Sequence, residues 1–226
     1  MVRIAALAAL GALTLATSAA LAQDDLRSRT NVAETQSANV EQAGPQREAA
    51  LAQANAALNG AQRLQGRFTQ IAPDGSRATG TLYLQRPGRL RFQYDPPATL
   101  LIVSDGSVVH MRDTALRNTE RTDLRSTPLN LILRPQVDLA RDSRITGVAR
   151  NGDWIIVEAR DRSGLTDGEI TMFFRGPNAD LRAWDIVDAT GSRTRIVLSE
   201  VSHPASFAQS LFRMEDMLPG RRPGRP

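Results

Sequence analysis

The sequence predicts a mainly β (α+β) domain, built on one antiparallel sheet that carries helices on a single face. Two observations predict the sheet: apolar residues recur at every second position in many short segments after residue 63, and turn sequences rich in Gly, Pro and Asp separate those segments. The third observation is that only residues 45–62 and 127–133 have helical character, so both helices must pack on the sheet. A sandwich, a barrel and a strongly curved sheet all remain compatible with this pattern.

The composition narrows the class of protein. The chain has 226 residues, of which 41% are hydrophobic and 23% charged, which is typical of a soluble globular protein with one domain or two small ones. Cysteine is absent, which excludes disulfides, cysteine-ligated metals and thiol catalysis.

The positive net charge does not indicate a nucleic-acid-binding face. Every basic residue is arginine, and leaving out Arg3 and the three arginines among the last six positions gives 24 arginines against 24 acidic residues. The sequence pI of about 10.7 is high because almost no group titrates between His and Arg. We therefore expect no nucleic-acid partner.

Residues 1–22 have the pattern of a secretory signal peptide. Arg3 precedes an apolar run that ends in the small-x-small sequence 20–22, which predicts cleavage after Ala22 and export. The alternative is an uncleaved anchor, but the run is short and Ala-rich for a membrane span.

The next segments are a polar linker and one helix. Residues 23–44 have almost no large apolar side chains, which predicts a flexible linker. Residues 45–62 repeat Ala and Leu at helical spacing, with Pro45 at a first-turn position and Gly60 near the end.

Strands follow, interrupted by a second helix. Thr127 is a suitable N-cap and Pro128 a suitable first residue for the helix 127–133. Residues 206–226 form a C-terminal extension rich in Arg and Pro, which we expect to be disordered from residue 219. The predicted strands cover residues 80–85, 89–94, 100–103, 107–112, 145–149, 154–159, 169–174, 181–187 and 194–201.

No catalytic or metal-binding pattern stands out. His110 falls in a predicted strand and His203 in a turn, and neither has a nucleophile or metal ligand at a recognisable spacing. The sequence 104–106 (Ser-Asp-Gly) is typical of a hairpin turn. We expect no enzymatic activity, no metal and no cofactor.

One charged residue, Arg86, stands out because of its position in a predicted strand. Strand alternation places it on the same face as Leu82 and Leu84, directly before Pro87. It either turns outward at the rim of the sheet, or reaches between the sheet and the helices and donates hydrogen bonds to the free carbonyls at a helix C-terminus.

An ordered set of motifs resembles the LolA family of periplasmic outer-membrane lipoprotein carriers. The set comprises residues 66–70 (GRFTQ), 80–84 (GTLYL), 86–97 (RPGRLRFQYDPP), 102–106 (IVSDG) and 127–133 (TPLNLIL). The resemblance implies that residues 45–205 form an incomplete antiparallel β-barrel with a lid of helices over an apolar cavity. It also implies that Arg86 holds the closed lid by hydrogen bonds and is displaced on loading.

The chain departs from the family pattern at two places. Phe92 stands where the family often has Trp, and residues 109–112 (VHMR) replace an aromatic-rich strand. LolB, which shares the fold, needs an N-terminal Cys for lipidation, so the absence of cysteine favours the soluble carrier.

The resemblance predicts a monomeric periplasmic carrier whose partners are acylated lipoproteins, an inner-membrane lipoprotein-releasing ABC transporter and an outer-membrane lipoprotein acceptor. A periplasmic regulator that senses lipids or lipoproteins with a similar half-barrel is the main alternative, and a periplasmic hydrolase is a third. The same side chains would form either an acyl-binding cavity or an ordinary core. These predicted cavity residues are Leu82, Leu84, Leu90, Phe92, Tyr94, Leu129, Ile132, Leu133, Met172 and Phe174.

Overall fold

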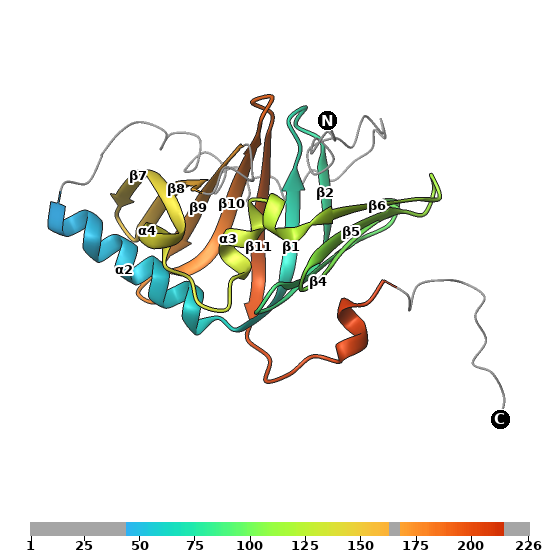
Figure 1. Ribbon diagram of the computed structural model, residues 1–226, viewed down its shortest axis with the longest axis horizontal. Helices are drawn as coiled ribbons and strands as arrows, with labels where there is room; N and C mark the ends of the chain where they lie inside the picture. The colour runs from blue at the N-terminus through green and yellow to red at the C-terminus, as the bar shows by residue number, and fades with distance from the viewer. Residues whose placement is uncertain (1–43, 163–167, 215–226) are drawn as a thin grey trace, which may run out of the picture.

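The structure is a computed structural model that describes residues 44–162 and 168–214 (Figure 1). The predicted signal peptide, linker residues 23–43 and the tail from residue 219 lie outside the described residues.

Eleven strands form one antiparallel sheet with the order β6-β5-β4-β3-β2-β1-β11-β10-β9-β8-β7. Strands β6 and β7 are its two edges and do not pair, so the sheet curves without closing (Figure 1). The prediction of a mainly β, unclosed antiparallel fold is therefore confirmed. The strands are β1 (Arg63–Ile71), β2 (Arg77–Gln85), β3 (Arg89–Tyr94), β4 (Leu100–Asp105), β5 (Val108–Asp113), β6 (Asn118–Asp123), β7 (Ser143–Asn151), β8 (Trp154–Asp161), β9 (Gly168–Arg175), β10 (Asp180–Asp188) and β11 (Arg193–Ser202).

Three helices lie together on one face of this sheet (Figure 1): α2 (Gly44–Gly60), α3 (Leu129–Leu133) and α4 (Leu139–Asp142). We call them and the residues that join α3 to α4 the helical layer. In α2 the buried residues Ala50, Ala54 and Leu58 are spaced by four and share one face. Two of the three are alanine, which brings the helix backbone close to β7, β8 and β10.

Alternation along the strands sends one set of side chains toward the helical layer. Leu82 pairs with Phe92 and Leu84 with Leu90 across β2 and β3, and all four are buried in the core. The core therefore lies between the curved sheet and the helices.

Strand β6 and helix α4 are among the elements that the sequence did not predict. Strand β6 reads Asn-Thr-Glu-Arg-Thr-Asp and is mostly exposed, so it has no apolar alternation. Its pairing with β5 over six residues is what makes it a strand. Helix α4 has only four residues, too few for a periodic pattern, and the Asp138 side chain caps it by accepting from the Arg141 N–H.

The start of the predicted C-terminal extension is packed against the sheet. The short helix η4 (Gln209–Phe212) contacts the face of β3 and β4 that points away from the helical layer. Phe212 is buried, Arg89 donates to the Gln209 side chain (2.7 Å), and Arg91 donates to the carbonyl of Leu211 (3.2 Å). The sequence prediction missed this packing because it grouped the segment with the Arg- and Pro-rich tail, although Phe207, Leu211 and Phe212 give it apolar side chains.

Candidate functional site

Arg86 lies in the interface between the sheet and the helical layer, where β2 and two helices end. Its side chain is only 6% exposed and points inward from the end of β2. Its Nε donates to the carbonyl of Ile132 in α3 (2.8 Å), and its Nη1 donates to the carbonyl of Ala61 (2.6 Å) and to that of Leu58 in α2. These are carbonyls in the last turn of each helix or just beyond it, which lack partners within the helix. One side chain thus joins a strand to two helices.

The turn that follows Arg86 adds a backbone hydrogen bond to α3. Gly88 has φ of +70°, a conformation that glycine adopts without strain, and a Cβ there would lie 2.5 Å from the carbonyl oxygen of Gly106. Its N–H donates to the carbonyl of Leu133 (2.8 Å), and its own carbonyl accepts from the buried Ser104 hydroxyl (2.6 Å). The Arg-Pro-Gly sequence therefore satisfies two consecutive carbonyls at the end of α3.

Burial lowers the pKa of Arg86 to about 10, because the charged guanidinium loses its hydration. The side chain is still cationic at neutral pH. Its attraction to the carbonyl dipoles of both helices is therefore that of a full charge, which makes each bond stronger than one between neutral groups.

The residues predicted to line a cavity all lie in the core between the sheet and the helices. Each is at most 9% exposed. They belong to one continuous apolar cluster and come from β2, β3, α3 and β9. The members are Leu82, Leu84, Leu90, Phe92, Tyr94, Leu129, Ile132, Leu133, Met172 and Phe174.

Two aromatic residues that sequence reasoning missed complete this interior. The Phe68 ring packs edge-on against Phe92 and Tyr94 with centroids 5.0 and 4.9 Å apart, and Trp184 lies 6.2 Å from Phe92. Gly80 leaves room for the Phe68 ring, because a Cβ there would lie 2.6 Å from it. The alternation of β1 carried the signal for Phe68. Strand β10 is irregular between Leu181 and Ala183, which brings both Leu181 and Trp184 into the core, so simple alternation did not mark Trp184.

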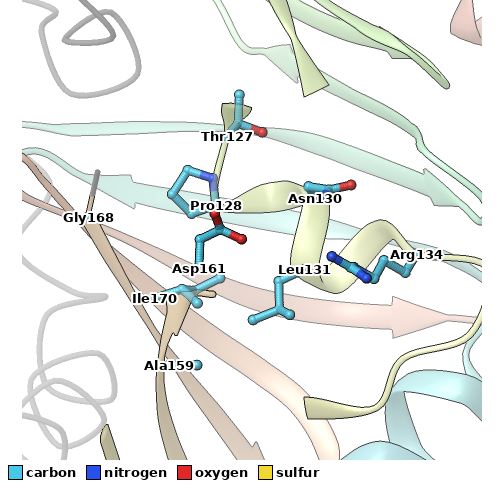
Figure 2. A pocket seen from close by; sticks show the side chains of 9 residues that line it. All are labelled: Thr127, Pro128, Asn130, Leu131, Arg134, Ala159, Asp161, Gly168 and Ile170. Carbon is cyan, nitrogen blue, oxygen red and sulfur yellow. The ribbon is translucent and has the colours of Figure 1, made fainter. Parts of the chain in front are cut away.

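The space beside α3 at the edge of this interior is small. A cavity of about 20 Å³, enough for about one water molecule, lies between α3 and strands β8 and β9. Figure 2 shows Leu131 on α3 facing Ala159 and Ile170, with Arg134 beside them. An acyl chain fits only if the helices move away from the sheet. A second hollow, open to solvent and of about 590 Å³, lies on the other side of α3 beside the β4–β5 turn, and Asn130 borders both spaces.

The histidines take part in local contacts. His110 Nε2 lies 3.3 Å from the Asp105 carboxylate, and Asp105 also accepts from the N–H groups of Ser107 and Val108 in the β4–β5 hairpin turn. His203 Nδ1 lies 2.9 Å from the carbonyl of Arg63. Among residues 44–162 and 168–214, no group of three or more His, Asp or Glu side chains is arranged to hold a metal ion.

The helices of this described part do not include one that is long and apolar enough to cross a membrane.

Two further polar residues were missed. Asn59 of α2 bonds the backbone of Val137, between α3 and α4, and Asn55 of α2 bonds the backbone of Leu139, the first residue of α4. Nothing in the sequence distinguished them from solvent-exposed helix residues.

Comparison with known proteins identifies the family. A family model described as "Outer membrane lipoprotein carrier protein LolA" matches residues 59–215, which include the Arg-Pro-Gly turn and η4. The outer-membrane lipoprotein carrier protein of Chromobacterium violaceum is 30% identical over 179 residues, covering 75% of this chain and 85% of that protein. Its counterpart from Xylella fastidiosa strain 9a5c is 31% identical over 170 residues, covering 70% and 80%.

Among solved structures, a LolA superfamily protein from Nitrosomonas europaea aligns with a TM-score of 0.46 at 10% identity, over 79% of this chain and all of that one (100%). The description of the matching family model names a carrier and no reaction. By the extent of the family match and the identity to its curated relatives, this chain belongs to the LolA family of outer-membrane lipoprotein carrier proteins.

Proposed function

We propose that this protein binds the acyl chains of lipoproteins released from the inner membrane, shields them across the periplasm and delivers them to an acceptor at the outer membrane. The observation that supports this best is the position of Arg86, a buried cation that fastens two helices over an apolar interior. In this role the helical layer is a lid.

Loading is an exchange between two sets of interactions. Each hydrogen bond from the charged Arg86 contributes about 1.5–3 kcal/mol to the closed state. Each methylene of an acyl chain contributes about 0.8 kcal/mol when it is buried. A chain of twelve or more methylenes (roughly 10 kcal/mol) is therefore enough to replace the three Arg86 bonds (about 4.5–9 kcal/mol). Losing those bonds limits how tightly the cargo is held.

Release follows from the same balance. Because the lid closes over a filled core, the empty protein has its own stable state to return to. An acceptor that competes for the chains is then helped by the closure of the lid. The lipoproteins come from an ABC transporter that releases them at the inner membrane, and the carrier acts as a monomer without a cofactor.

Purification from periplasm without detergent tests the carrier function. The protein is expected to carry triacylated lipoproteins, detected by mass spectrometry, and to release them to outer-membrane vesicles that contain the acceptor. A parallel expression of a lipoprotein whose acylated cysteine is replaced by serine is the control, and it should yield no complex. Equal recovery of the non-acylated cargo would contradict acyl-chain binding, and cleavage of the cargo would favour a hydrolase.

Release of the exported protein into the periplasm requires removal of residues 1–22. We expect the N-terminus of the periplasmic protein to be Gln23, because Ala20 and Ala22 fit the small-residue cleavage site. Intact-mass measurement of the exported protein checks this, with a variant that carries bulky residues, Ala20→Leu with Ala22→Leu, as the uncleaved control. An exported wild-type chain that retains Met1 would contradict the prediction.

A further inference from the structure

Asn55 and Asn59 hold α2 to the start of α4 and to the connection that precedes it. The Asn59 side chain bonds Val137 in both directions: its Nδ2 donates to the Val137 carbonyl and its Oδ1 accepts from the Val137 N–H, each at 2.8 Å. One turn earlier, the Asn55 Oδ1 accepts from the Leu139 N–H at 2.9 Å. The two asparagines are four residues apart and so share one face of α2.

These bonds replace the secondary structure that this connection lacks. The Val137 and Leu139 side chains are buried in the core (1% and 0% exposed), although Val137 belongs to no helix or strand. Backbone groups next to buried side chains need partners. An asparagine amide offers one acceptor and two donors, so Asn59 satisfies both backbone groups of Val137 as a neighbouring strand would.

The asparagine bonds differ from the Arg86 bonds in what they connect. Arg86 joins β2 to the helices, and Gly88 joins the following turn to α3. Asn55 and Asn59 join one part of the helical layer to another and do not include the sheet. Breaking the Arg86 bonds therefore leaves the asparagine bonds unstrained.

We propose that Asn55 and Asn59 are positioning residues that make the lid one moving unit. In this proposal, which rests on the carrier function above, α2 and the 134–142 segment leave the sheet together. The asparagine bonds persist in the open and closed states, while the bonds from Arg86 and Gly88 form only in the closed state. Acyl chains then meet a lid that opens as a whole, and a partly open form that exposes them to water is avoided.

Amide hydrogen exchange tests the proposal without any ligand, because each set of bonds includes its own N–H group. The Gly88 amide reports contact between the sheet and the lid, and the Val137 and Leu139 amides report contact within the lid. In Arg86→Leu, exchange at Gly88 should speed up about tenfold or more, as expected for loss of one or more hydrogen bonds, while Val137 and Leu139 keep wild-type protection.

Substitution of Asn59 should give the reverse of the pattern expected for Arg86→Leu. In Asn59→Leu, exchange at Val137 should speed up about tenfold or more while Gly88 stays protected. Asn59→Asp keeps an acceptor for the Val137 N–H and should retain most of the protection. Asn178→Leu makes the same change in an exposed turn outside the lid and should alter none of the three amides.

Two results would overturn the proposal: loss of protection at Val137 together with Gly88 in Arg86→Leu, or wild-type protection at Val137 in Asn59→Leu. A second arm adds a synthetic triacylated lipopeptide to the wild-type protein. Gly88 should lose protection on binding, while Val137 and Leu139 keep it. Failure to bind the lipopeptide would count against the carrier function, and the ligand-free arm would still decide the role of the asparagines.

Discussion

Replacement of Arg86 by leucine is expected to leave the sheet folded and to make loaded carrier accumulate in the periplasm. Without the guanidinium, the closed lid would bury three carbonyls, those of Leu58, Ala61 and Ile132, with no donor from this side chain. Opening exposes them to water, so the closed state loses stability relative to the open one. Loss of even one of these bonds, about 1.5–3 kcal/mol, shifts the ratio of open to closed protein roughly tenfold to a hundredfold, and loss of all three shifts it further.

The shift of Arg86→Leu toward the open state has opposite effects on the loading and on the release of lipoproteins. Acyl chains no longer compete with the Arg86 bonds, so they are held more tightly and passed on poorly. The fraction of periplasmic carrier with bound lipoprotein should rise, and the rate of transfer to outer-membrane vesicles should fall at least tenfold. Both can be measured on protein purified without detergent.

Two variants make this result interpretable. Arg77→Leu removes an exposed arginine at the start of the same strand and should behave like the wild type. Arg86→Lys keeps the positive charge but loses the planar set of donors that reaches both helices, so it should be only partly functional. If Arg86→Leu loads and releases lipoprotein as Arg77→Leu does, Arg86 does not hold the lid.

Replacement of Leu84 by glutamate is expected to abolish lipoprotein transfer. Leu84 is 2% exposed and pairs with Leu90 in the apolar cluster beneath the helices. An unpaired carboxylate is costly among these side chains, and it disfavours an acyl chain at the same place. Binding of a fluorescent triacylated lipopeptide should weaken about a hundredfold or more, and the free energy of unfolding should fall by several kcal/mol.

The neighbouring residue supplies a matched control. Gln85→Glu adds the same charge one position along β2, where the side chain points to the other face of the sheet, and should preserve both binding and stability. Leu84→Gln adds polarity without charge and keeps the test informative if the glutamate variant unfolds. Wild-type transfer by a folded Leu84→Glu protein would show that the acyl chains bind elsewhere.

The fold was largely readable because the strands have simple patterns. In β2 and β3 the alternation of Leu82, Leu84, Leu90 and Phe92 predicted which side chains face the core, and the structure places all four there. Turn sequences such as 104–106 located the hairpins. Strand β6 gave no such signal, because it is a polar edge strand that pairs only through its backbone with β5.

The candidate site, like the fold, was predicted from the sequence only in part. Strand alternation placed Arg86 on an apolar face, since alternation depends only on neighbouring residues. It left open whether the guanidinium turns outward or inward, because its acceptors at positions 58, 61 and 132 are 25 to 46 residues away in the chain. The same limit hid Asn55 and Asn59, whose partners lie 84 and 78 residues away. Hydrogen bonds between distant segments form only once the helices have packed on the sheet, and that packing is visible in the folded chain and not in local sequence patterns.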